Sequence, residues 1–389
     1  MPFEVGDPRP LRGLIRDADV VVMRPASPVV SGWLRASGAR IVYDLIDPLP
    51  LDILEGRARA SREQQLMWNT IALDHLLEAL HTGHHFICAG ERQRDLYLGA
   101  LLASRLIGPA AYAADPSFRS FIDAVPFGIP SEPPRPIPGI GPKALLPGVG
   151  EDSQVVLWSG GIWNWLDPVT AVAATVKAAE RNDAVRLVFM FARDVLDGSE
   201  ERREARAAYE LAEQLGALDR LVFFNRSEIP YGERASWLMD ADCILSTHRD
   251  HLESTFAFRT RLLDCFWAGV PAVCTAGDEL SDRIARCDGG ISVPHRDVDA
   301  VAGGILAVLG RGREAYRERL QAAGADLVWP TVVEPLRRMV QLSGRPRALG
   351  DPWARRAARP LHRGRSAAIR LMRGAFNGAA AARSARGKS

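Results

Sequence analysis

The chain has 389 residues, which suits two domains better than one, because a typical domain holds roughly 150 residues. With 47% hydrophobic residues, 25% charged residues and a mean hydropathy of -0.07, it is no disordered chain, collagen-like fibre or membrane-spanning bundle. The N-terminus lacks the apolar segment of a signal peptide. The chain has five cysteines, and they include no C-x-x-C pair. We therefore expect a cytoplasmic protein with neither a disulfide framework nor a zinc site.

The net charge of +2 is a sum of two opposite contributions. Residues 345–389 hold 12 Lys and Arg against one acidic residue, a net charge of +11. The rest of the chain holds 37 basic and 46 acidic residues, a net charge of -9. The sequence therefore predicts an acidic folded body followed by a basic tail.

Short apolar runs typical of buried parallel strands alternate with segments of helical periodicity along the chain. The strand-like runs cover residues 19–23, 40–45, 86–89 and 123–127, then 155–158, 186–191, 221–224, 243–245, 272–274 and 290–293. Helical periodicity is clearest over residues 168–180, 200–215, 231–239 and 298–309. This alternation predicts an α/β fold built on parallel sheets with helices on both faces.

A proline-rich segment divides the chain. Eight prolines stand between residues 126 and 147, where neither a helix nor a central strand can persist. We expect a first domain over residues 1–125, a linker over 126–150, a second domain over 151–343 and a tail over 344–389. No glycine-rich first βα turn precedes residue 19, so the first domain is expected to be incomplete at its front.

A strand that ends in a glycine pair precedes a well-marked helix start. Gly160 and Gly161 end the strand, Asp167 suits a helix N-cap and Pro168 suits the first helical position. Glycine lets backbone amides approach an anion closely, and a helix N-terminus favours phosphate. We expect these glycines and Trp163 to bind an anionic ligand; the alternative is a tight turn in which the tryptophan only packs.

A second helix opens with two arginines. Arg259, Thr260 and Arg261 stand at its start, and Gly269 ends it before the next strand. Two guanidinium groups at a helix N-terminus can clamp a diphosphate. Asp264 lies one turn further on, where a carboxylate would accept hydrogen bonds from ribose hydroxyls. The alternative is an ordinary ion pair between Arg261 and Asp264.

These two segments carry a family resemblance. Gly-Gly-Ile-Trp-Asn-Trp-Leu-Asp-Pro and Arg-Thr-Arg-Leu-Leu-Asp-x-x-Trp-Ala-Gly-Val-Pro resemble the second domain of group 1 (family 4) glycosyltransferases. Residues 86–95 and 124–130 resemble, more weakly, the end of that family's first domain. The resemblance implies the GT-B architecture, in which two Rossmann-like domains face each other across a cleft. It also implies sugar transfer from a nucleotide-diphosphate donor with anomeric retention, no metal at the diphosphate and no further cofactor.

The sequence departs from the family at the donor site. The second glutamate of the family's E-x7-E motif falls on Asp264, which implies a ribose ligand there. The first falls on Phe256, so Glu253 is its nearest substitute. The family's Arg and Lys after the first strand of this domain are missing, and we assign the cationic clamp to Arg259 and Arg261. Glu253 and Arg259 are thus the expected catalytic residues on this side.

Polar residues also follow other strands. His248 follows the strand-like run 243–245 and is expected to contact the donor sugar. Arg24, Asp44 and Asp47 follow two strands of the first domain, and parallel strands present such ends to the ligand crevice. We expect them on the acceptor side, with Asp44 or Asp47 orienting the acceptor hydroxyl or assisting its deprotonation. A turn aspartate before Pro48 is the alternative for Asp47.

The predicted function is transfer of a sugar to a glycan, a lipid-linked or a small-molecule acceptor. A nucleotide-sugar epimerase of the same fold and a non-catalytic partner subunit are the alternatives. The basic residues 345–389 suggest attraction to an anionic membrane surface, which would make the protein peripheral to the inner face of the membrane. A solvated end is the alternative for the tail, and its sparse aromatic residues disfavour nucleic-acid binding.

Overall fold

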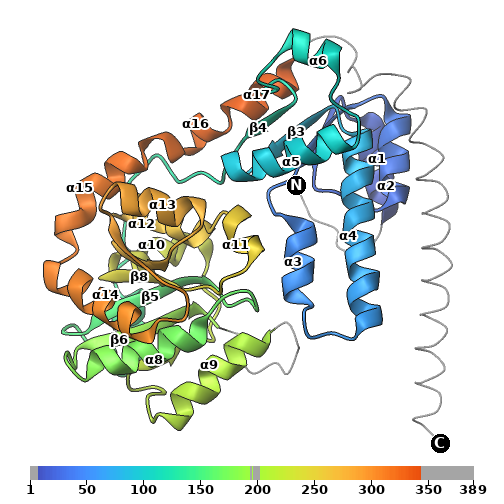
Figure 1. The fold of residues 1–389 in the computed structure, drawn as a ribbon. Coiled ribbons are helices and arrows are strands. Elements are labelled where there is room, and N and C mark those ends of the chain that lie inside the picture. The colour runs from blue at the N-terminus through green and yellow to red at the C-terminus, as the bar shows by residue number, and fades with distance from the viewer. Residues whose placement is uncertain (1–7, 193–194, 196–201, 343–389) are drawn as a thin grey trace, which may run out of the picture.

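The computed structural model describes residues 8–192, 195 and 202–342. Two parallel sheets form two lobes that lie side by side (Figure 1). The first lobe has four strands in the order β1-β2-β3-β4, and the second has six in the order β10-β9-β8-β5-β6-β7. The predicted α/β class is confirmed. The first sheet is the smaller one.

In the first lobe the strands alternate with helices. The strands are β1 (Val20–Met23), β2 (Arg40–Asp44), β3 (His85–Cys88) and β4 (Ile122–Ala124). The helices are α1 (Pro8–Asp17), α2 (Pro28–Ser37), α3 (Leu49–Gly56), α4 (Arg62–Thr82), α5 (Glu91–Ala103) and α6 (Pro109–Ala114). Helix α4, the longest, starts at a capping box in which Ser61 and Gln64 exchange side-chain and backbone hydrogen bonds.

The second lobe repeats the alternation of strands and helices. Its strands are β5 (Gln154–Gly161), β6 (Val185–Phe191), β7 (Val222–Phe224), β8 (Cys243–Ser246), β9 (Ala272–Thr275) and β10 (Gly290–Val293). Its helices are α7 (Pro142–Leu145), α8 (Pro168–Ala179), α9 (Arg203–Gln214), η2 (Tyr231–Glu233), α10 (Arg234–Met239), α11 (Leu252–Phe256), η3 (Thr260–Leu262), α12 (Leu263–Ala268), α13 (Glu279–Arg286), α14 (Val298–Arg311) and α15 (Glu314–Ala323). The chain then continues through η4 (Ala325–Leu327), α16 (Trp329–Val332) and α17 (Glu334–Gln341).

The strand order of the second sheet locates its ligand crevice. Strands β5, β6 and β7 run outward in one direction and β8, β9 and β10 in the other. This is the doubly wound Rossmann order, and ligands bind where the order reverses, at the carboxyl ends of the two central strands. Here those strands are β5 and β8, which pair through Val156 with Cys243 and Leu157 with Ile244.

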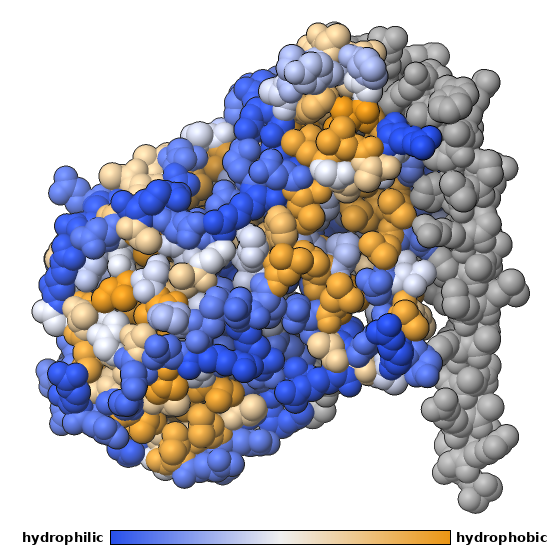
Figure 2. All heavy atoms as spheres, viewed as in Figure 1, coloured by the Kyte–Doolittle hydropathy of each residue, from blue (hydrophilic) through white to orange (hydrophobic). Residues whose placement is uncertain are grey.

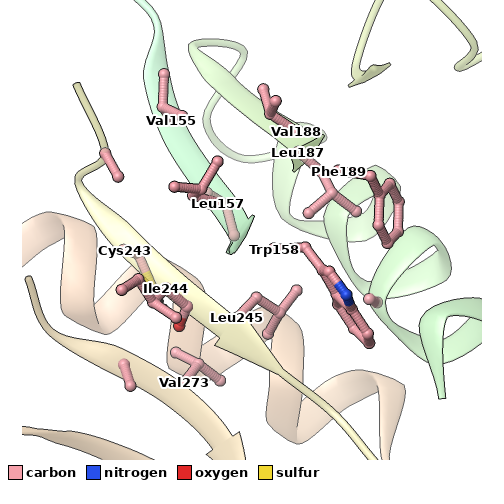
Figure 3. Close-up of a cluster of buried hydrophobic side chains, with 14 of the residues drawn as sticks. Val155, Leu157, Trp158, Leu187, Val188, Phe189, Cys243, Ile244, Leu245 and Val273 are labelled. Carbon is pink, nitrogen blue, oxygen red and sulfur yellow. Dashed lines mark hydrogen bonds between the residues drawn. The ribbon is translucent and has the colours of Figure 1, made fainter. Parts of the chain in front are cut away.

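The core of the second lobe is a continuous apolar cluster on both faces of this sheet. Figure 3 shows side chains of four adjacent strands interlocking within it, among them Leu157 and Trp158 of β5, Phe189 of β6 and Leu245 of β8. Trp158 is fully buried, and its ring centroid lies 5.3 Å from that of Phe189. Close packing of this kind holds the ends of β5 and β8 at fixed positions.

The two lobes are joined by two chain crossings. Ile129 of the proline-rich segment pairs with the segment just before α16: its amide donates to Leu327 O (2.8 Å), and its carbonyl accepts from Trp329 N (3.0 Å). The chain then returns to the first lobe in α17, whose buried Met339 packs against Val42 of β2. The expected domain limit at residue 343 would assign α17 to the second domain. Its apolar side chains pack instead on the first lobe, in one cluster with Val42 and Ile87.

All ten predicted strands are present within a few residues of the expected limits. Asp167 caps α8 as predicted, accepting from Thr170 N at 3.2 Å, and Pro168 follows it. Gly269 ends α12 in the left-handed conformation, with a φ of 64°. No described helix has the length and apolar character needed to cross a membrane. The predicted basic tail lies outside the described residues.

Candidate active site

The floor of the candidate site is the junction between the ends of β5 and β8. Thr247, just after β8, donates through Oγ1 to Asp167 O at 2.6 Å, and its own carbonyl accepts from Asp167 N at 3.0 Å. This double contact ties the loop after β5 to the end of β8. The Gly160–Gly161 pair, at the end of β5, therefore lies at the point where the strand order reverses.

Arg261 is the cation that lies nearest this glycine pair. Its Nη2 donates to Gly161 O at 2.8 Å, and its guanidinium carbon lies 4.6 Å from the ring centre of Trp158. A β-carbon at Gly160 would lie only 3.3 Å from the same guanidinium carbon. Glycine at position 160 therefore allows the Arg261 guanidinium group to pack closely against the end of β5.

Among the described residues, no carboxylate accepts a hydrogen bond that would neutralise the charge of Arg261. Its Nη1 is buried and has no hydrogen-bond partner among the described residues. Burial, helped by the neighbouring Arg259 and opposed by Asp264, lowers the pKa of Arg261 to about 9. A buried donor without an acceptor is costly, and an anion at this position would remove that cost.

Arg259 is engaged differently from the free clamp that we expected. Its Nη2 donates to Glu253 Oε2 at 2.7 Å and to Ser254 Oγ at 3.1 Å. Glu253 and Arg259 are both buried, and His251 Nδ1 lies 3.4 Å from the same carboxylate oxygen. The arginine thus fixes Glu253, and its Nε remains without a partner among the described residues. The structure brings the two residues together as one ion pair.

The Asp264 side chain is buried. It forms an ion pair with Arg234, at the start of α10, and not with Arg261 as the alternative for this segment supposed. Its Oδ2 is buried without a hydrogen-bond partner among the described residues. Burial raises the pKa of Asp264 to about 6, although Arg234, Ser159 and Arg261 oppose that shift. Arg234 was not predicted as a site residue, because it lies 30 residues before Asp264 in a different helix.

A pocket of about 370 Å³ opens beside the glycine pair. Its walls come from the ends of β5 and β6 and from the loop after β7, and they include Gly161, Trp163, Phe191, Ala192, Ser227 and Ile229. Trp163 stacks on Trp165 with ring centroids 5.6 Å apart and an interplanar angle of 7°. Arg202 lies 4.5 Å from the ring centre of Trp163. Mostly apolar walls with a few polar groups are typical of a site for a planar ring.

The remaining donor-side residues have contrasting environments. Thr260 is exposed at the start of η3. His248 is buried at the end of β8, and its Nε2 lies 3.6 Å from Asp278 Oδ2. Both of these atoms lack hydrogen-bond partners among the described residues. Asp278 uses its other oxygen to cap α13, accepting from Ser281 N at 3.0 Å.

The predicted acceptor-side residues lie at the ends of β1 and β2. Arg24 donates to Asp47 Oδ2 at 2.5 Å, and both side chains are about half exposed. Asp44 Oδ1 accepts from Ile46 N at 3.1 Å, so it shapes the turn after β2. Burial raises the pKa of Asp44, and Arg24 opposes that shift. Asp47 is thus engaged in an ion pair and Asp44 in a turn, and their catalytic role stays a prediction.

Asp52 is a candidate that the sequence did not reveal. It lies in α3, and α3 contacts α11 of the second lobe. Burial raises the pKa of Asp52 to about 7; Asp47 and Glu253 raise it further, and Arg259 and Arg24 lower it. The carboxyl group therefore lies within electrostatic reach of charged residues from both lobes. Its sequence context carried no signal, because it stands alone among apolar residues.

Within the described part of the chain, no cluster of three or more His, Cys, Asp or Glu side chains is arranged to hold a metal ion. His84 and His85 illustrate why. The Nδ1 of His84 accepts from Ile41 N at 3.0 Å, and His85 lies 2.9 Å from Ser120 O and 3.1 Å from Arg40. Their ring nitrogens are used in contacts that hold β2, β3 and β4 together.

Comparison of the whole chain with solved structures finds the same architecture. Sucrose-phosphate synthase of Thermosynechococcus elongatus is 17% identical, with a TM-score of 0.54 over 82% of this chain and 72% of that one. A UDP-forming trehalose-phosphate synthase of Burkholderia xenovorans is 12% identical, with a TM-score of 0.58 over 86% and 76%. Anabaena HepE in complex with UDP and glucose is 13% identical, with a TM-score of 0.60 over 85% and 80%.

These likenesses show the fold. The chain has the GT-B fold, with two Rossmann-like lobes facing each other, and it is structurally similar to glycosyltransferases of that fold. Comparison of the sequence with protein-family models and with curated proteins finds no match.

Proposed function

We propose that this protein is a glycosyltransferase that moves a sugar from a nucleotide-diphosphate donor to an acceptor held between the lobes. The observation that carries the proposal is Arg261. It is a buried guanidinium at the end of β5, held by a carbonyl and an aromatic ring, and one of its nitrogens has no acceptor in the part of the chain that the structure describes. A diphosphate over Gly160 and Gly161 would satisfy that nitrogen and the positive charge together.

The pocket beside the glycine pair suits the rest of a nucleotide. A nucleobase would occupy the space of about 370 Å³ between the loops after β5, β6 and β7. Asp264, with a buried and unpartnered Oδ2, would accept a ribose hydroxyl. Two neighbours of the same fold were captured with UDP-glucose or with UDP and GlcNAc, so UDP-sugars are the first donors to try.

Catalysis would be mainly electrostatic. When the sugar leaves, negative charge grows on the diphosphate, and Arg261 would stabilise it without reorganisation. Glu253 is held by Arg259 at the edge of the cleft, where a carboxylate would orient hydroxyls of the donor sugar. Asp52 lies in α3, which contacts α11, and it would hold or deprotonate the acceptor hydroxyl. We also propose that the transfer retains the anomeric configuration of the sugar and needs no metal ion.

The acceptor side has an apolar border. Hydrophobic side chains gather over α3 and its neighbours on the face that Figure 2 displays, beside a largely hydrophilic second lobe. Leu54 of α3 and Leu66 and Trp68 of α4 are exposed large hydrophobic residues of the first lobe. An apolar border next to the cleft supports an acceptor that carries a lipid, as in a lipid-linked glycan precursor. We propose that such an acceptor approaches along this surface.

A donor-consumption assay tests the proposal. UDP-, GDP-, dTDP- and ADP-sugars are incubated with the full chain, with and without glycan and lipid-linked acceptors, and the released nucleoside diphosphate is measured. A glycosyltransferase releases it from one donor, and faster when the acceptor is present. Interconversion of the donor sugar without release would favour the epimerase alternative. No turnover of any donor, with Arg261 intact, would contradict the proposed function.

A further inference from the structure

The two lobes cap each other's helices at one edge of the cleft. Helix α5 begins at the end of β3 in the first lobe, and α11 lies opposite it in the second lobe, beside α3. Neither helix provides its own side-chain cap at the end in question. Because the last carbonyls and first amides of a helix lack internal partners, they depend on groups from outside the helix.

The first lobe satisfies the carboxyl end of α11. Gln93 is buried, and its Nε2 donates to Phe256 O at 2.9 Å. Its Oε1 accepts from Ala89 N at 2.9 Å, so the side chain is fixed from its own lobe. Arg92 donates through Nη1 to Thr255 O at 3.4 Å and to Gly277 O at 2.6 Å.

The second lobe covers the amino end of α5 in return. Glu279, the first residue of α13, lies against Gly90, and a β-carbon there would meet its Oε2 at 2.0 Å. Burial raises the pKa of Glu279, and the backbone of Glu91 and Arg92 opposes the shift. A carboxylate at a helix N-terminus is stabilising. Arg92 Nη2 adds a direct ion pair with Asp282 Oδ2 at 2.5 Å.

The element that these contacts hold is part of the candidate site. Helix α11 has five residues and carries Glu253 and Ser254, which together bind the Arg259 guanidinium. So short a helix has little stability of its own and takes its order from its neighbours. The order of the Glu253–Arg259 pair therefore depends on a contact with the other lobe.

We propose that Gln93 and Arg92 are positioning residues of the donor site, which acquires its ordered form only when α5 caps α11. This inference rests on the proposed function, since it assigns a donor role to the Glu253–Arg259 pair. Residues that touch no part of the donor would then control its affinity by holding two main-chain carbonyls.

Hydrogen exchange of the full-length protein tests this inference without any ligand. Gln93→Glu keeps the size of the side chain and an acceptor for Ala89 N, but it places an oxygen opposite Phe256 O. Because the Phe256 carbonyl then loses its donor, exchange over residues 251–262 is expected to accelerate by roughly tenfold or more. Exchange over residues 154–161 of β5 should be unchanged in Gln93→Glu. Asp95→Asn, a control variant at an exposed residue of α5, should exchange as the wild type does.

Arg92→Met provides a second variant in case Gln93→Glu does not fold, and Arg92→Lys should restore part of the protection. In the same proteins, UDP affinity measured by calorimetry should fall with the loss of protection over residues 251–262. Unchanged exchange over residues 251–262 in both variants would overturn the positioning role. If the wild-type protein binds no UDP while the exchange result holds, the donor assignment fails and the contact between α5 and α11 does not.

Discussion

Arg261 donates to the carbonyl oxygen of Gly161 at 2.8 Å, and this contact joins η3 to the end of β5. The partner is a neutral carbonyl, so the hydrogen bond fixes the guanidinium without cancelling its charge. A carboxylate partner would have fixed it equally well and left little field for a ligand. The cation is thus held in place, desolvated and available to an anion at the reversal of strand order.

The pocket beside the glycine pair can be closed without altering the core. Ser227 is exposed on its wall, and its backbone, not its hydroxyl, forms the hydrogen bonds of the loop with Asn225. Ser227→Trp should fill the space and abolish nucleotide binding in calorimetry, with no loss in the midpoint of thermal unfolding. Ser227→Ala is the matched control and should bind as the wild type does. Full affinity in the tryptophan variant would place the nucleobase elsewhere.

Asp264 should give the fold a distinctive dependence on pH. Its pKa is about 6 in the folded protein, against an ordinary value of 3.8. The folded state therefore binds more protons than the unfolded state between these values, and the free energy of unfolding falls as pH rises through that window. In the wild type, this titration should lower the free energy of unfolding by on the order of 1 to 3 kcal/mol between about pH 4 and pH 6. Asp264→Asn should lack this contribution.

Urea unfolding of wild type and Asp264→Asn at several pH values measures this difference. Comparing the two proteins cancels the contributions of other titrating groups. Asp299→Asn, a change at an exposed residue, should keep the wild-type slope. Equal slopes in the wild type and Asp264→Asn would mean that the Asp264 carboxyl titrates normally.

Asp52 should control the transfer rate and its pH dependence. A group that accepts the acceptor proton works in its ionised form, so the rate should rise with pH through about 7, the pKa of Asp52. Asp52→Asn should lower the rate on the order of 100-fold and remove this rise. Glu55→Gln, on the same helix, is the matched control. A wild-type pH profile in Asp52→Asn would assign proton transfer to another group.

Helix α17 should be needed for the stability of the first lobe. Met339 is buried against Val42 and Val125, so Met339→Ala should lower the free energy of unfolding by about 2 to 5 kcal/mol. Hydrogen exchange in β2 and β3 should accelerate, while β5 and β8 keep their protection. Leu342→Ala removes a half-exposed side chain and should cost little. A loss of protection confined to the second lobe would contradict the packing of α17 on the first sheet.

The fold was predictable because its signals are local. Each strand of the two sheets is a short apolar run, and the start of α8 at Asp167 and the end of α12 at Gly269 follow capping rules that operate over a few residues. Helix α4 was harder, because its apolar residues are spread around the helix and give no clear face. Helices α3 and α4 were therefore not marked, and Asp52 was missed with them.

The site was predictable only where its partners are close in sequence. The arginine pair and Asp264 were found because they stand within one turn of a helix N-terminus. Their true partners come from distant segments: Gly161 for Arg261 and Arg234 for Asp264. The Glu253–Arg259 pair needed the geometry of α11, which depends on the other lobe. Contacts across lobes carry no periodic pattern, so the sequence cannot show them.

The central claim is that Arg261 holds the diphosphate of a nucleotide donor. Calorimetry of the full chain with UDP, GDP, dTDP and ADP tests it most directly, using wild type, Arg261→Lys and the exposed control Arg181→Lys. Lysine keeps the charge but loses the planar fork that pairs with phosphate, so affinity should fall by roughly tenfold or more. At least one nucleotide should bind the wild type and Arg181→Lys equally. Binding of none of the four, or equal binding by Arg261→Lys, would contradict the claim.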